Sequence, residues 1–102
     1  MKILLVCAAG MSTSLVVNKM KKARTAKEVN WVIEAQPADS LEEVIEDYDV
    51  VLLGPQIKYK EDEIREIADE HDKACGVIDS TDYGLGNGRN ILDLAIKLNE
   101  EK

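Results

Sequence analysis

The sequence predicts an α/β fold: a single open, four-stranded parallel sheet with helices on both faces. Short apolar stretches alternate with stretches whose apolar residues recur at helical spacing, in the order β-α-β-α-β-α-β-α. Such alternation is typical of parallel strands joined by crossover helices. The strand stretches are apolar at successive positions, which indicates burial on both faces. We expect the strand order 2-1-3-4, which reverses between the first and third strands.

The expected strands are short and mostly aliphatic, and we place them at residues 2–7, 31–36, 49–54 and 74–79. Pro55 directly follows the third strand and should end it, because proline has no N–H for the sheet ladder. In a sheet of this order, the loops after the first, third and fourth strands meet at one edge. We therefore expect residues 7–14, 54–59 and 79–88 to converge there.

The helices are expected between these strands, over residues 14–27, 61–72 and 90–101, with a short helix after Ser40. Ser40 and Glu43 have the spacing of a capping box, which predicts the start of that short helix. Residues 82–88 contain three glycines and are expected to form a loop.

The composition favours a globular cytoplasmic protein of one domain, residues 1–102. Hydrophobic residues make up 45% of the chain, and no apolar run approaches the length of a membrane span. No signal peptide opens the chain. The net charge of −7 argues against nucleic acid as a partner. A local basic stretch over residues 19–27 is read as a solvated helix face in preference to a patch for an anionic partner.

Cys7 is the strongest candidate for a functional residue, because it stands where the first strand ends and a loop of small residues begins. That loop consists of Ala8, Ala9, Gly10, Met11, Ser12, Thr13 and Ser14. Its backbone amides and the positive end of the following helix would stabilise an anion, either a thiolate or a phosphoryl group. We therefore expect Cys7 to be a nucleophile and the loop to bind phosphate.

The second cysteine, Cys75, opens a predicted inner strand and no amide-rich loop follows it. We expect it to pack in the core. A disulfide with Cys7 is disfavoured in the cytosol. No set of Cys and His residues has the spacing of a metal site, and no cofactor is expected.

A cysteine followed by five residues and then Arg-Ser or Arg-Thr marks the phosphate loop of cysteine phosphatases, but here Thr13 takes the place of the arginine. That arginine would hold the transferring phosphoryl group, so its absence predicts slow hydrolysis and a persistent thiophosphate. Asp79 and Asp82 follow the fourth strand, where a phosphatase would keep its general acid. A cysteine-based phosphatase or arsenate reductase therefore stays open as an alternative, as does a non-catalytic regulatory domain.

Several segments together resemble one family: residues 7–17, 33–35, 49–57 with Tyr59, and 77–80 with Tyr83 and Gly84. They are similar to the IIB component of the bacterial phosphoenolpyruvate-dependent sugar phosphotransferase system (PTS), in its lactose/cellobiose (diacetylchitobiose) branch. The similarity runs nearly from end to end, with gaps in the helices. The loop after Cys7 and the Leu-Gly-Pro-Gln-Ile segment at 53–57 make the match specific.

The resemblance implies a fold shared with low-molecular-weight tyrosine phosphatases and a phosphocysteine at Cys7. A IIA protein would donate the phosphoryl group from a histidine. Cys7 would pass it to a disaccharide bound by the membrane permease IIC, so the chain would work at the inner face of the membrane. Gln56, Tyr59 and Asp79 are expected near the site, and Met11 and Ile57 on a docking surface.

Overall fold

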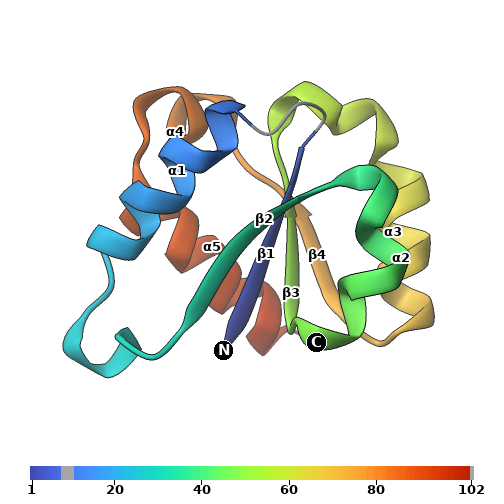
Figure 1. Cartoon of the computed structure of the whole chain (residues 1–102), viewed down its shortest axis with the longest axis horizontal. Helices are drawn as coiled ribbons and strands as arrows, with labels where there is room; N and C mark the ends of the chain where they lie inside the picture. The colour runs from blue at the N-terminus through green and yellow to red at the C-terminus, as the bar shows by residue number, and fades with distance from the viewer. Residues whose placement is uncertain (8–10, 102) are drawn as a thin grey trace.

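The first strand lies at the centre of the fold. The structure is a computed structural model that describes residues 1–7 and 11–101. In these residues, β1 (Lys2–Cys7) pairs with β2 (Val32–Pro37) on one side and with β3 (Val50–Leu53) on the other, and β4 (Ala74–Val77) completes the sheet. All three pairings are parallel and the order is β2-β1-β3-β4 (Figure 1). The predicted fold class and strand order are confirmed.

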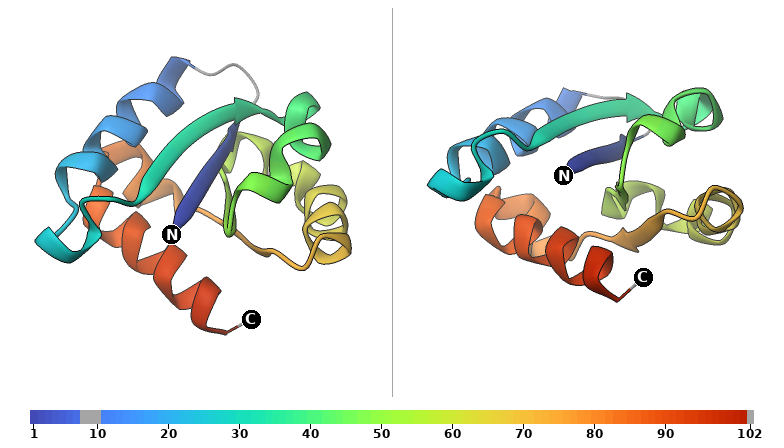
Figure 2. Two further views of the ribbon diagram at one scale, coloured as in Figure 1. Left: turned by 60° about the horizontal axis from the view of Figure 1, so that its bottom comes forward. Right: turned by 90° about the horizontal axis from the view of Figure 1, so that it is seen from below.

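Helices cover both faces of this sheet. On one face lie α1 (Met11–Lys22) and α5 (Gly88–Glu100), and on the other lie α2 (Leu41–Val44) and α3 (Glu61–Glu70) (Figures 1 and 2). The side chains of β1 alternate between the two resulting cores: Ile3 and Leu5 pack toward α1 and α5, whereas Leu4 and Val6 pack toward α2 and α3. This double burial explains why β1 and β3 are apolar at every inner position.

Two predicted boundaries of the first helix are wrong. The helix α1 begins at Met11 rather than at Ser14 and ends at Lys22 rather than at residue 27. A separate 3-10 turn, η1 (Ala26–Glu28), follows it, and the N–H of Thr25 donates to the Glu28 carboxylate at 2.9 Å. The hydrogen bond between Thr25 and Glu28 stabilises this turn as a separate element. The helical pattern in the sequence therefore continues beyond the residue at which α1 ends.

The predicted capping box at Ser40 is also wrong. Ser40 already has a right-handed helical backbone, inside the 3-10 turn η2 (Ala38–Ser40), and its side chain makes no capping hydrogen bond. A capping serine needs an extended backbone to reach the amides ahead of it. The helix α2 is consequently short, and a further 3-10 turn, η3 (Ile45–Asp47), continues the chain to β3.

The glycine-rich segment expected as a loop contains a helix instead. This helix, α4 (Ser80–Leu85), begins after Asp79 and ends at Gly86, whose φ of 64° is left-handed. Gly86 can adopt this conformation because it has no Cβ. The last helix, α5, then begins at Gly88, before the expected Asn90. No helix in the described part of the chain is both long and apolar enough to cross a bilayer.

The helices α1 and α5 approach each other closely at Gly88. A Cβ built on Gly88 would lie 2.3 Å from the carbonyl oxygen of Lys19 and 2.8 Å from the backbone N of Met20. Both atoms belong to the α1 backbone, so no side-chain rotation could relieve the contact. Glycine at position 88 is therefore required for the packing of these two helices.

A buried carboxylate joins the turn after α1 to α5. The side chain of Glu28 is largely buried and pairs with both terminal nitrogens of Arg89, Nη1 to Oε1 at 2.8 Å and Nη2 to Oε2 at 3.2 Å. The same guanidinium donates to Asp93 Oδ1 at 2.8 Å and to the carbonyl oxygen of Ala23 at 3.2 Å. The hydrogen bonds from Arg89, more than any other cause, lower the pKa of Glu28 from 4.5 to about 2.

We expect Glu28→Gln to lower the free energy of unfolding at pH 7 by about 1–3 kcal/mol, because the Arg89 guanidinium loses its buried anion and keeps only the exposed Asp93 carboxylate. The folded-state pKa of Glu28 lies below its ordinary value, so this stability is present above pH 4.5 and is lost as the pH falls toward 2. Urea unfolding at pH 7 and between pH 5 and 3 measures both effects. The variant should lose less stability on acidification than the unchanged protein does.

A matched control is Glu66→Gln, which removes an exposed carboxylate from α3. It should change the free energy of unfolding by no more than about 0.5 kcal/mol. Equal stability of the two variants at pH 7 would contradict a stabilising role for the Glu28–Arg89 pair.

Candidate functional site

Cys7 is the last residue of the central strand, at the edge of the sheet where the strands end. Its side chain is 6% exposed. The alternation along β1 puts Cys7 on the face of Ile3 and Leu5, which is the face that α1 covers. The first residue of α1, Met11, follows only a few residues later, so Cys7 lies at the beginning of the strand-to-helix connection (Figure 1).

The ends of β3 and β4 meet the end of β1 at this edge, as the sequence predicts. The N–H of Gly54, just after β3, donates to the carbonyl oxygen of Val6 at 3.1 Å. The N–H of Ile78, just after β4, donates to the carbonyl oxygen of Leu53 at 2.9 Å. These ladder bonds bring Cys7, Gly54 and Ile78 into line at one edge of the sheet.

The predicted phosphate loop is only partly described. Ala8, Ala9 and Gly10 lie outside the described residues. Met11, Ser12, Thr13 and Ser14 form the first turn of α1 instead of a loop. The N–H groups of a first helical turn have no partner within the helix and attract anions. Ser14 is exposed and borders a cavity of about 280 Å³ between α1 and β2. Phosphate binding by residues 8–14 stays a prediction.

Gln56 lies close to the edge of the sheet, in the turn η4 (Pro55–Lys60). Its Oε1 atom lies 2.8 Å from the position that a Cβ on Gly54 would occupy. Gln56 also borders a cavity of about 280 Å³ between α1 and α4, which includes Leu15, Lys19 and Leu85. This position agrees with the expectation that Gln56 lies near the strand ends. A role of Gln56 in the site remains a prediction.

Two other residues of η4 differ from each other in exposure. Tyr59 is 77% exposed, so its ring is available at the surface. Ile57, in contrast, is 1% exposed and packs in the core between the sheet and α3. The expectation that Ile57 forms part of a docking surface is wrong, because its side chain fills this core and offers no area to a partner.

Asp79 and Asp82 both serve as hydrogen-bond acceptors around α4. Asp79 Oδ1 accepts from the N–H groups of Thr81 at 2.9 Å and Asp82 at 3.2 Å, which caps the helix. Asp82 Oδ1 accepts from the side-chain amide of Asn90 at 3.0 Å. The geometry therefore favours structural roles for both residues.

Asp79 nevertheless stays near the edge where the strands end. It borders a cavity of about 310 Å³ together with Pro55, Lys58 and Ser80. The helix that Asp79 caps, α4, is an element near this edge that sequence reasoning missed. A capping residue at position 79 followed by an acid at the third helical position, Asp82, is a helix-start signal, but the glycines at 84, 86 and 88 obscured it.

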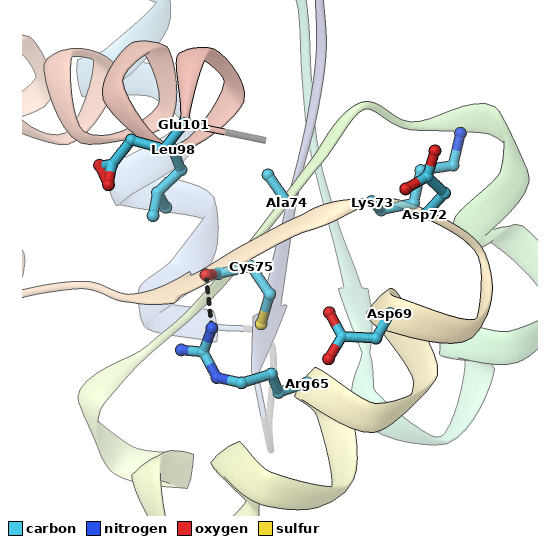
Figure 3. Close-up of a pocket in the computed structure, with 8 residues that line it drawn as sticks. All are labelled: Arg65, Asp69, Asp72, Lys73, Ala74, Cys75, Leu98 and Glu101. Carbon is cyan, nitrogen blue, oxygen red and sulfur yellow. Dashed lines mark hydrogen bonds between the residues drawn. The ribbon is translucent and has the colours of Figure 1, made fainter.

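Cys75 lies in the core between the sheet and α3, as predicted, and its side chain is buried. Burial raises the pKa of its thiol to about 11. Figure 3 shows its surroundings, where Arg65 Nη1 donates to the Cys75 carbonyl oxygen at 3.3 Å. These residues border a cavity of about 340 Å³ at the outer edge of β4. Both cysteines are free, and only Cys7 stands at the end of a strand.

Metal binding has no ready set of ligands in the described residues. Within 1–7 and 11–101, no group of three or more His, Cys, Asp or Glu side chains is placed to hold an ion.

A family model describes nearly the whole chain. Residues 2–94 match the family "PTS system, Lactose/Cellobiose specific IIB subunit". The chain belongs to this family. It is a sugar-specific IIB component of the phosphotransferase system, and it is of the phosphotransferase class.

Curated relatives agree with this assignment. The IIB chain is 37% identical over 97 residues to the oligo-beta-mannoside-specific EIIB component of Bacillus subtilis (strain 168), covering 95% of this chain and 94% of the relative. It is 36% identical over 101 residues to the cellobiose-specific EIIB component of Lactococcus lactis subsp. lactis (strain IL1403), covering 94% of each chain. The sugars in these names differ, so the names establish the family and leave the sugar of this chain open.

Solved structures show the same fold. The solution structure of the cellobiose-specific IIB component from Borrelia burgdorferi superimposes with a TM-score of 0.82 at 41% identity, covering 100% of this chain and 94% of that one. The lactose-specific IIB domain from Streptococcus pneumoniae gives a TM-score of 0.83 at 17% identity, covering 96% of each chain. The second similarity concerns the fold alone.

Proposed function

We propose that this IIB chain carries a phosphoryl group on Cys7 during sugar uptake. It accepts the group from a phosphohistidine of a IIA protein and passes it to a disaccharide held by the membrane permease IIC. The observation that carries this proposal is the position of Cys7, at the end of the central strand and just before the first turn of α1, in a member of the IIB family.

In the first step, the Cys7 thiolate attacks the phosphorus of the phosphohistidine. A sulfur–phosphorus bond forms while the nitrogen–phosphorus bond breaks, and the electron pair of the broken bond returns to the imidazole nitrogen. The phosphoryl group moves in line between the two atoms, and this transfer depends mainly on positioning and anion stabilisation. The N–H groups of the first turn of α1 are the described donors nearest in sequence to Cys7.

In the second step, a hydroxyl oxygen of the sugar attacks the same phosphorus. An oxygen–phosphorus bond forms, the sulfur–phosphorus bond breaks, and its electron pair restores the thiolate. The hydroxyl proton passes to water or to a base of the permease. Two proteins must reach one sulfur in turn, which requires the site at an edge of the fold, and the end of β1 is such an edge (Figure 1).

Transfer to a sugar is favoured over hydrolysis by two features. The sequence has Thr13 where cysteine phosphatases hold an arginine, so the charge that develops during hydrolysis lacks its usual partner. The two aspartates that follow β4 accept hydrogen bonds at α4, so both carboxylates already have structural partners. We place the protein in the cytoplasm, at the inner face of the membrane while it works with IIC.

The test is labelling driven by phosphoenolpyruvate, with the general phosphotransferase proteins and the IIA protein, followed by peptide mapping. We expect one phosphoryl group per chain, on Cys7, and its loss when permease membranes and the right sugar are added. A label on another residue would refute the assignment. Hydrolysis of an aryl phosphate at an ordinary enzymatic rate would favour the cysteine phosphatase instead.

A further inference from the structure

One face of α1 is exposed and has a distinct chemical character. Leu15, Asn18, Lys19 and Lys22 recur at intervals of three and four residues, so they align along one side of the helix, and all four are exposed. We call these four residues the α1 stripe. Its length from Leu15 to Lys22 is about 10 Å at the rise of an α-helix. Its apolar end is the end nearer the start of α1, and therefore nearer the connection from Cys7.

The α1 stripe continues onto α4. Leu15 is 60% exposed and Leu85 is 74% exposed, and both border the cavity of about 280 Å³ between the two helices. Lys19 borders it too, and its Cγ atom lies 3.2 Å from the position of a Cβ on Gly86. The surface therefore combines two large apolar side chains and Lys19 around a hollow with Lys22 one helical turn further along α1. Exposed leucines at a hollow are typical of a surface that binds another protein.

The charge on this surface is opposite to that of the chain as a whole. The net charge is −7, and the acidic side chains gather on α2 and α3, on the other face of the sheet (Figure 1). The four ion pairs in the described residues join other side chains, and none includes Lys19 or Lys22. The two ammonium groups are thus available to an acidic partner.

We propose that the α1 stripe and Leu85 form the docking surface for the phosphoryl donor protein, through an acidic and apolar patch on that protein. This inference rests on the proposed function, because it concerns the partner of the Cys7 site. The donor arrives with the extra negative charge of its phosphoryl group, which the lysines attract. After transfer that charge resides on this chain, the attraction weakens, and the spent donor leaves.

The permease fits this surface less well. Cytoplasmic segments of membrane proteins are enriched in lysine and arginine, and such a surface would be repelled by Lys19 and Lys22. Like charges placed against each other suppress association with a wrong partner. The charge of the α1 stripe therefore selects the donor rather than the permease.

The experiment measures the rate of Cys7 phosphorylation against the concentration of phosphorylated IIA. We expect Lys22→Glu and Lys19→Glu each to raise the apparent KM at least about fivefold, with the maximal rate nearly unchanged, because a peripheral charge affects encounter more than chemistry. Added salt should reduce the difference from the unchanged protein. Lys97→Glu, an equal charge change at the far end of α5, is the matched control and should leave KM unaltered.

The apolar part is tested by Leu85→Ser, compared with Val29→Ser at an exposed valine outside the surface. Only Leu85→Ser should raise KM. Unchanged KM in the Lys22 and Leu85 variants, with normal labelling of the unchanged protein, would overturn the docking surface and leave the proposed function intact. If these variants accepted the phosphoryl group from IIA normally but passed it to the sugar more slowly, the assignment of this surface to the donor would be overturned. The surface would then belong to the permease. Absence of any label on the unchanged protein would instead refute the proposed function.

Discussion

The Cys7→Ser variant will take up no measurable phosphoryl group from phosphorylated IIA. A hydroxyl is a far weaker nucleophile than a thiolate. Loss of a nucleophile typically lowers a rate by about a thousandfold or more. A serine phosphate formed slowly would also be a poor donor to a sugar hydroxyl, because one oxygen ester would merely replace another.

Intact-mass measurement after phosphoenolpyruvate-driven labelling checks this result. Cys75→Ala is the matched control: it removes the other thiol, which is buried in the core and away from the strand ends, and it should label at the normal rate. A melting curve on each variant separates loss of labelling from loss of fold. A phosphoryl group on the folded Cys7 variant would exclude Cys7 as the acceptor.

The Gly88→Ala variant will be strongly destabilised, by about 2–4 kcal/mol. In an ordinary helix the same change stabilises by up to about 1 kcal/mol, because alanine has the higher helix propensity. At position 88 the new methyl carbon would lie 2.3 Å from the Lys19 carbonyl oxygen, so the backbones of α1 and α5 must move apart. Overpacking against a fixed backbone costs more than the propensity gains. The movement also opens the core around Met20, which packs between these helices and the sheet.

Urea unfolding and thermal melting measure this effect, which corresponds to a fall in Tm of roughly 10–25 °C for a domain of this size. Gly84→Ala is the matched control, because Gly84 lies in α4 and no atom lies within 4 Å of a Cβ built there. It should leave stability unchanged or slightly raised. If the two variants had equal stability, the close approach of α1 and α5 at position 88 would be disproved.

The core of the fold could be predicted from the sequence because its strands are buried on both faces. In β1 and β3 nearly every residue is aliphatic, and only the inner strands of a covered parallel sheet need such a pattern. Their alternation with helical patterns then fixes the topology. The position of Cys7 followed directly, since the residue after an apolar run in a parallel sheet must lie at the edge where the strands end.

The errors arose where local signals compete with packing. Ile57 stands between polar neighbours in the sequence, which suggested an exposed side chain. Whether a side chain of a 3-10 turn faces the core depends on how η4 packs against α3, and residue spacing does not determine that packing. Ser40 has the right residue type for a cap, but the preceding turn had already taken it into a helical backbone. The pairing of Glu28 with Arg89 joins residues 61 positions apart, so no local pattern indicates it.

The start of β1 and the end of α5 both lie on the side of the sheet opposite the end of β1 (Figure 1), and they stand apart from each other in the view from below (Figure 2). The strand β1 runs from that side toward the site, and α5 returns to it. A fluorescent reporter, an immobilising tag or a second protein fused at either end would consequently stand away from the edge at which Cys7 lies. Under the proposed function, a chain tethered in this way to a surface or to a permease would keep the Cys7 edge turned toward its partners.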